Sequence, residues 1–234
     1  MTDPTPVDEI VVVGQRRLPG GTFPARGGGG PGDSGGDQQI EVTDDPGQPT
    51  PPPDPCANPE TAVPWNADAK AAASAADFLA HAATLGGADA PNGLARLSNR
   101  EFGRGLARGP GGSVSGNAVS HGPPLVPGSG VASITINMDG ITPYNYIGDV
   151  HSHPFGTTRP TELDWLSFMA TNAQARDVGR TQETFYLYII TVDQNGNPST
   201  IHVYQDGPRA ANSPSPPRPT ETGPEVNPDA QPCG

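Results

Sequence analysis

The chain has 234 residues and a formal net charge of −12, and it contains 31 Gly and 30 Pro. Gly and Pro together reach roughly twice their usual share and only 33% of residues are hydrophobic, so the whole chain is not expected to form one packed globule. The acidic charge speaks against a protein held on nucleic acid by phosphate contacts, and the sequence has no apolar run of about 18 residues that would span a membrane.

The distribution of Pro predicts three regions. Residues 65–204 hold only 9 of the 30 Pro residues. We therefore predict a disordered Gly/Pro-rich region over residues 1–64, one folded domain over residues 65–206, and a disordered Pro-rich tail over residues 207–234. Within the first region, residues 8–17 are rich in Val and Ile and predict a short strand or an adhesive segment that adds to a partner's sheet.

The predicted domain opens near Trp65 with a helix from Ala67 to Leu85. Small side chains recur three or four residues apart and favour close packing against a sheet; they are Ala72, Ala75, Ala76, Leu79 and Ala83. The following segment, residues 97–107, is strand-like and carries Glu101. Gly and Pro then dominate residues 109–130, which predicts a long exposed loop or flap.

The second half of the domain alternates strands with one helix. Residues 131–136 and 147–150 predict two strands, and residues 184–192 and 199–204 predict two more around a turn at Asn195-Gly196. A helix is predicted from Thr161 to about Asp177, with one stripe formed by Leu163, Leu166, Ala170 and Ala173. This order of elements predicts the α/β class, with a mixed sheet flanked by two helices.

Two histidines stand at the end of the second predicted strand. His151 and His153 are two residues apart, so both imidazoles lie on one face of a regular strand. Asp164 follows eleven residues after His153, in the first turn of the next predicted helix. Two imidazoles and one carboxylate with a fourth position open are a typical ligand set of catalytic zinc.

This pattern resembles a known motif. His-x-His-Pro, followed eight residues after the second His by a hydroxyl residue and three further by Asp, is similar to the JAMM (MPN+) metallopeptidase motif. The similarity extends over roughly residues 65–204 and is closest to bacterial JAB-like domains of unknown function at the ends of Rhs-repeat and other polymorphic toxins. It implies an MPN/JAB-like (cytidine-deaminase-like) fold and a zinc metallopeptidase or isopeptidase that hydrolyses an amide bond in a protein or peptide substrate.

The resemblance also implies roles for individual residues. His151, His153 and Asp164 would ligate Zn²⁺, and Glu101 would be the general acid/base. Thr161 stands where the family usually has serine, and its hydroxyl would donate a hydrogen bond to the developing oxyanion. The implied setting is a bacterial toxin or effector with an immunity or delivery partner, located in the cytoplasm or exported without a standard signal peptide.

Other interpretations fit some of the same residues. Thr161 and Asp164 are spaced as a helix capping box, which would compete with zinc for the Asp164 carboxylate. The domain could also be a non-catalytic MPN-type module that binds a protein partner. His121 and His202 have no partner at ligand spacing and are predicted to be structural, and Trp165 is predicted to pack within its helix.

The two cysteines leave a further alternative open. Cys56 and Cys233 lie in the Pro-rich flanks and are too few for a disulfide framework or a Cys-rich zinc site. A bond between them would tie the flanks together and indicate an oxidising compartment. Two unpaired thiols on mobile tails fit the sequence equally well.

Overall fold

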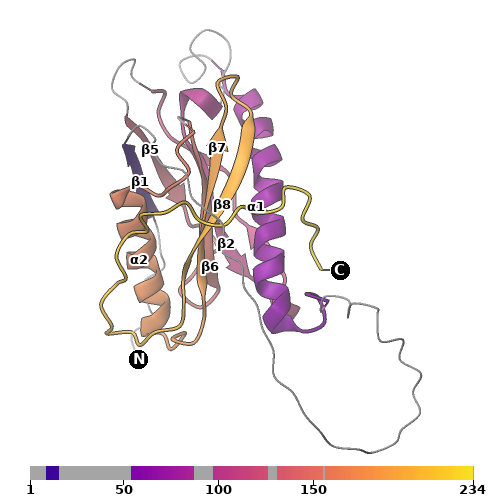
Figure 1. Ribbon diagram of the computed structural model, residues 1–234, viewed down its shortest axis with the longest axis vertical. Coiled ribbons are helices and arrows are strands. Elements are labelled where there is room, and N and C mark those ends of the chain that lie inside the picture. The colour runs from indigo at the N-terminus through magenta and orange to yellow at the C-terminus, as the bar shows by residue number, and fades with distance from the viewer. Residues whose placement is uncertain (1–8, 16–53, 87–96, 126–130, 155, 234) are drawn as a thin grey trace, which may run out of the picture.

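The computed structural model describes residues 9–15, 54–86, 97–125, 131–154 and 156–233. In it a six-stranded mixed sheet lies between two helices, which confirms the predicted α/β class (Figure 1). The elements in chain order, with η for a 3-10 helix, are β1 (Glu9–Gln15), α1 (Pro59–Thr84), η3 (Leu97–Asn99), β2 (Phe102–Arg108), η4 (Pro110–Gly112), β3 (Val114–Gly116), β4 (Ser120–His121), β5 (Val131–Asn137), β6 (Tyr146–His153), α2 (Glu162–Asp177), β7 (Phe185–Val192) and β8 (Pro198–Asp206).

The main sheet has the strand order β3-β2-β6-β7-β8, and β4 also pairs with β2. Strands β6 and β7 are parallel and are joined through α2, whereas the other neighbours in this sheet are antiparallel. Every residue of β6 and β7 is buried, as expected for central strands covered on both faces. A second, two-stranded sheet pairs β1 with β5, so the strand predicted within residues 8–17 adds to a strand of its own chain.

The core has two halves because side chains alternate across the sheet. In β7, Phe185, Leu187 and Ile189 belong to the cluster that contains the inner face of α2. The intervening residues belong to the cluster that contains the inner face of α1; they are Tyr186, Tyr188, Ile190 and Val192. Each helix therefore covers one face of the sheet (Figure 1).

Helix α1 begins at Pro59, six residues before the predicted opening at Trp65. Asn58 caps it, because its side chain accepts hydrogen bonds from the backbone N–H groups of Glu60 and Thr61, both at 3.0 Å. The predicted packing stripe is right in part: Ala72 and Ala75 pack against the core, whereas the other three residues, Ala76, Leu79 and Ala83, are exposed. The buried face includes Ala67, Ala71, Ser74, Phe78 and Ala82.

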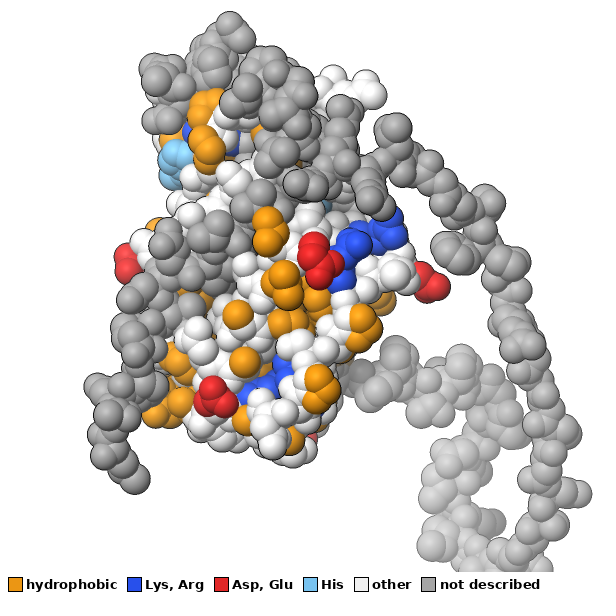
Figure 2. Space-filling view, turned by 90° about the vertical axis from the view of Figure 1, so that its left-hand side faces the viewer, with side chains coloured by type: hydrophobic (Ala, Val, Ile, Leu, Met, Phe, Trp, Pro, Cys, Tyr) orange, Lys and Arg blue, Asp and Glu red, His pale blue; other side chains and the backbone are white. Residues whose placement is uncertain are grey.

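Helix α2 confirms the predicted span but not the predicted stripe. Leu163 and Leu166 are 43% and 52% exposed. Figure 2 shows the side of the molecule on which α2 lies, where several hydrophobic side chains reach the surface. The buried face instead carries Trp165, Phe168, Met169, Asn172, Ala175 and Arg176.

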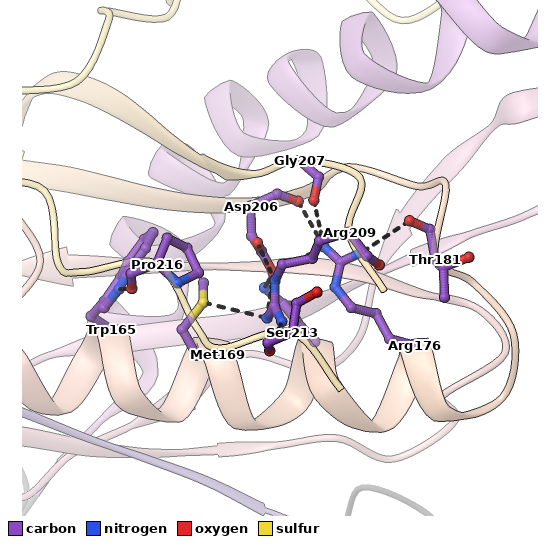
Figure 3. Close-up of polar contacts among 10 residues, drawn as sticks. Trp165, Met169, Arg176, Thr181, Asp206, Gly207, Arg209, Ser213 and Pro216 are labelled. Carbon is purple, nitrogen blue, oxygen red and sulfur yellow. Dashed lines mark hydrogen bonds and ion pairs between the residues drawn. The ribbon is translucent and has the colours of Figure 1, made fainter. Parts of the chain in front are cut away.

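Polar residues occupy the inner face of α2 because they have partners there (Figure 3). The fully buried Arg176 pairs with Asp206 at the end of β8, with 3.0 Å between Nη2 and Oδ2, and also donates to Gly207 O at 2.8 Å. Arg209 Nε donates to the other oxygen of Asp206 at 3.0 Å, and Asn172 Nδ2 donates to Asp206 Oδ2 at 3.0 Å. A buried charge that is paired and hydrogen-bonded avoids most of its desolvation cost.

The predicted disorder of the tail does not hold for residues 207–233. After β8 the chain returns and pairs with the outer edge of that strand: Val203 N donates to Pro224 O at 3.0 Å and Val226 N to Ile201 O at 2.8 Å. Val226 joins the core cluster on the α1 side. Composition misses this arrangement because a few backbone bonds and two buried residues, Val226 and Ala230, are enough to fix a Pro-rich segment.

The tail also contacts the loop between β6 and α2. Arg218 Nη1 donates to Pro160 O at 3.0 Å, and the hydroxyl oxygens of Thr222 and Thr158 are 2.9 Å apart. Trp165 Nε1 donates to Pro216 O at 2.9 Å, a contact that Figure 3 also shows. The segment from Pro216 to Val226 therefore links this loop to the edge of the sheet.

The predicted flap over residues 109–130 is wrong for its described part. Residues 110–125 include η4, β3 and β4, and both strands pair with β2. Residues 126–130, 1–8 and 16–53 lie outside the described residues, so the predictions made for them remain predictions. No helix in the described ranges is long and apolar enough to cross a bilayer.

Candidate metal centre

Three separate elements deliver the predicted site residues. His151 and His153 are on β6, and Asp164 is in the first turn of α2. Glu101 directly precedes β2, where Gly103 pairs with His151 in antiparallel register; continuing that register puts Glu101 across from His153. The neighbouring strands and the helix after β6 thus bring all four residues to one end of β6.

The potential ligand atoms converge as the sequence predicted. His151 Nε2 and His153 Nε2 are 3.1 Å apart, and Asp164 Oδ2 lies 3.7 Å and 3.3 Å from them. A tetrahedral zinc with bonds of 2.0–2.1 Å separates its ligand atoms by about 3.3 Å. His151, His153 and Asp164 are the one group of three potential metal ligands within the described ranges. The separations therefore fit a metal ion of this kind.

The second ring nitrogen of each histidine has its own partner. His153 Nδ1 lies 3.0 Å from Thr157 O, and His151 Nδ1 lies 3.4 Å from Asp149 Oδ1. A carboxylate only accepts, so Nδ1 of His151 is the donor to Asp149. His153 Nδ1 also lies 2.8 Å from Thr157 Oγ1, a hydroxyl that can donate or accept, and donation from Nδ1 to Thr157 O corresponds to a neutral ring whose Nε2 carries no proton. The two Nε2 atoms are 3.1 Å apart, and a positive charge shared between them, from a proton or a metal ion, stabilises this approach.

Asp164 serves both the cap and the cluster. Its Oδ2 accepts from Thr161 N at 2.6 Å, and Thr161 Oγ1 accepts from Asp164 N at 3.1 Å, so the capping box is present. The same Oδ2 faces the histidines, and the buried Oδ1 has no hydrogen-bond partner. The capping box and the contacts with the histidines thus share Oδ2. The cap uses Thr161 Oγ1 as an acceptor, which does not conflict with donation of its proton elsewhere.

Glu101 is held by its backbone, while one side-chain oxygen is left unsatisfied. Glu101 O accepts from Gly122 N at 2.8 Å, and the next residue, Phe102, donates its N–H to Ser152 Oγ at 2.9 Å. Glu101 is 1% exposed, and its Oε2 has no hydrogen-bond partner. A buried carboxylate oxygen without a partner is costly and points to a group that the site is built to receive.

The charges of the cluster favour a cation among the ligands. Burial raises the pKa of Glu101 to about 8. Burial alone would lower the pKa of His151, but its bonds to Asp149 and Asp164 raise it to about 10. For Asp164 burial opposes ionisation, yet its bonds to His151 and His153 hold its pKa far below the usual range. Positive charge is thus stabilised where the three ligand atoms meet.

Glycine makes room beside the cluster. A Cβ at Gly103 would lie 3.1 Å from His151 Cβ and 3.0 Å from Ile136 Cδ1. Both contacts are closer than ordinary van der Waals distance. Gly103 thus lets β2, β5 and the first histidine pack together.

The remaining histidines have partners of other kinds. His202 lies 2.9 Å from Thr200 Oγ1 and 3.1 Å from Gly223 O, in agreement with a structural role. His121 Nδ1 is 3.1 Å from His81 Nε2, a pairing that the sequence spacing did not indicate. Trp165 is 3% exposed and packs in the core, as predicted.

Sequence reasoning missed two residues of the site. Asp149 and Thr157 bind the outer nitrogens of the two histidines. Asp149 could have been found by its position, since it lies two residues before His151 on the same face of β6. Thr157 lies in a loop, where no periodicity indicates which side chain turns inward.

Comparison with known proteins found no matching family model, no similar curated protein and no similar solved structure.

Proposed function

We propose that this chain is a zinc-dependent peptidase or isopeptidase of the JAMM (MPN+) type, with an MPN/JAB-like fold. It would hydrolyse an amide bond in a protein or peptide substrate. The observation that carries the proposal is the convergence of His151, His153 and Asp164 on one point, with the unsatisfied carboxylate of Glu101 buried at the same end of β6.

The ligand chemistry supports zinc over harder cations. Two imidazoles and one carboxylate suit zinc and related transition metals, whereas Mg²⁺ and Ca²⁺ prefer ligand sets made of oxygen. The bound ion would supply a Lewis acid that polarises the amide carbonyl and makes water more acidic.

Glu101 is proposed as the general acid/base. Its pKa of about 8 lies near neutrality, where a carboxylate accepts a proton and returns it most effectively. The proton taken from water would pass to the leaving amine. The hydroxyl of Thr161 would donate to the oxygen on which negative charge develops.

Burial of the cluster favours a second candidate. All four of the residues His151, His153, Asp164 and Glu101 are at most 2% exposed. A structural metal site is closed to solvent, and a closed site is sufficient for a non-catalytic MPN-type module that binds a protein partner. In the enzyme, by contrast, a segment beside the cluster has to move before an amide bond reaches it.

Metal analysis tests the site. Purified protein prepared without chelator should hold about one zinc per chain, and His153→Ala should lose it. His202→Ala is the matched control, because this histidine lies outside the cluster. Wild-type protein without zinc would overturn the proposal.

A comparison of cut sites separates the enzyme from the binding module. Glu101→Gln should keep the zinc and abolish cleavage, and Glu221→Gln, an exposed carboxylate of the tail, should leave both unchanged. Cells that express wild-type protein would show protein termini that are missing in cells with Glu101→Gln. Identical termini in both would favour the module.

The biological setting is also part of the proposal. Resemblance alone supports a bacterial toxin or effector with an immunity or delivery partner. The disulfide between Cys56 and Cys233 supports the exported alternative, because such bonds persist mainly in oxidising compartments.

A further inference from the structure

Strand β6 contains an irregularity just before the histidines. The register of its pairing with β2 shifts: Ala107 pairs with Tyr146, whereas Leu106 pairs with Gly148. A Cβ at Gly148 would lie 1.9 Å from Tyr186 O, so this close approach to β7 requires glycine.

The shift changes which side chains share a face. In a regular strand, residues three apart point to opposite faces. In β6, however, Tyr146 and Asp149 meet, since Tyr146 Oη donates to Asp149 Oδ2 at 3.2 Å. A bulge of this kind commonly redirects a side chain beside a functional site.

Asp149 contacts His151 with its other oxygen. Oδ1 lies 3.4 Å from His151 Nδ1, and Asp149 is 1% exposed. We infer that Asp149, oriented by Tyr146, is a positioning residue that fixes the Nδ1–H tautomer of His151 and so presents Nε2 to the metal. The inference rests on the metal site of the proposed function.

The far end of this chain of contacts is also fixed. Tyr146 is fully buried and stacks on Phe185, with 5.9 Å between ring centroids. Arg180 Nη1 donates to Tyr146 O at 2.6 Å and to Pro143 O at 2.8 Å. Burial and the charge of Asp149 raise the pKa of Tyr146 well above its usual value, so its hydroxyl remains a donor.

The two histidines differ in this respect. The outer nitrogen of His153 lies beside the neutral carbonyl and hydroxyl oxygens of Thr157, whereas that of His151 lies beside a carboxylate. A carboxylate on the outer nitrogen makes an imidazole a stronger ligand, and its loss typically weakens metal binding 10- to 100-fold.

Zinc affinity, measured by competition with a chromophoric chelator, tests the inference on the full chain. Asp149→Asn keeps the shape but removes the charge and should weaken zinc binding about 10- to 100-fold. Tyr146→Phe should weaken it less. The matched controls are Asp68→Asn and Tyr188→Phe, a similar pair joined at 2.8 Å on the opposite face of the sheet, which should leave the affinity unchanged.

The Nδ1–H group of His151 gives a second measurement that needs no metal. In nitrogen-15-labelled, metal-free protein, NMR should show a His151 Nδ1–H proton that exchanges slowly with water in wild type and faster in Asp149→Asn, because the mutation weakens the hydrogen bond to residue 149. Unchanged zinc affinity in Asp149→Asn, or an unchanged exchange rate, would overturn the positioning role. If wild type binds no zinc, the proposed function fails, while the exchange measurement still decides the role of Asp149.

Discussion

Cys56 and Cys233 are joined by a disulfide although 177 residues separate them in the sequence. The bond holds the end of the tail beside the start of α1, where Cys233 N donates to Asn66 Oδ1 at 2.7 Å and Trp65 Nε1 donates to Gln231 O at 2.6 Å. It resolves the alternative that the sequence left open.

Loss of this disulfide should destabilise the protein. Closing so long a loop restricts the unfolded chain, and the expected loss is about 2–5 kcal/mol of unfolding free energy. Urea unfolding of wild type with and without reductant measures it. The double variant Cys56→Ser/Cys233→Ser should match reduced wild type and should not respond to reductant; equal stability of all forms would contradict the prediction.

Glu101→Gln should stabilise the metal-free protein at alkaline pH. The pKa of Glu101 is raised from 4.5 to about 8, so between these values the folded state binds more protons than the unfolded state. The unfolding free energy of wild type therefore falls as pH rises through this window. At pH 8 the unfolding free energy of the variant should exceed that of wild type by about 1–3 kcal/mol, and this difference should shrink toward pH 5. A gain independent of pH in urea unfolding would refute this account.

Asp206→Asn should weaken the junction between α2 and β8. Burial opposes ionisation of Asp206, but hydrogen bonds from Arg209, Arg176 and Asn172 lower its pKa below 3.8. The ionised Asp206 therefore contributes to the unfolding free energy above about pH 4, and this contribution is lost as pH falls through the folded-state pKa. At pH 7 the unfolding free energy of the variant should be about 3 kcal/mol lower than that of wild type, because the buried charge of Arg176 loses the opposite charge of Asp206.

The control for that measurement is Asp177→Asn, which changes an exposed carboxylate at the end of α2. It should leave both the stability at pH 7 and the acid transition nearly unchanged. If wild type and Asp206→Asn unfolded at the same acid pH, ionisation of Asp206 would not be the cause of the loss of stability at low pH.

Gly103→Ala should disturb the metal centre by overpacking. The added Cβ would lie 3.1 Å from His151 Cβ and 3.0 Å from Ile136 Cδ1, and such crowding costs about 1–3 kcal/mol. The melting temperature should fall, and with it the zinc content that the proposed function expects. Gly86→Ala, where nothing lies within 4 Å of the new Cβ, should change neither.

The predictable parts of this protein are local in the sequence. Strands β5 to β8 and helix α2 follow from periodicity over a few residues. The convergence of His151, His153 and Asp164 follows from a two-residue spacing on a strand and a short loop to a helix start. Glu101 was placed by family resemblance, and the strand register brings it to the same end of β6.

The parts that were missed depend on contacts between distant residues. Arg176 faces inward because its charge is paired with Asp206, thirty residues later. The buried face of α2 is therefore partly polar, and a prediction from apolar periodicity chose the exposed face instead. The tail has an ordered path because of Cys56 and the edge of β8. Asp149 meets Tyr146 only through the bulge at Gly148, which periodicity does not reveal.

The tail segment from Pro216 to Val226 connects the edge of the sheet to the loop that precedes Asp164. One protease nick in this segment would loosen both places in a single event. Nicked material would then melt early and, on the proposed function, release its zinc, even though every proposed ligand residue was intact. A sample that has lost the tail could therefore be mistaken for a protein that never bound metal.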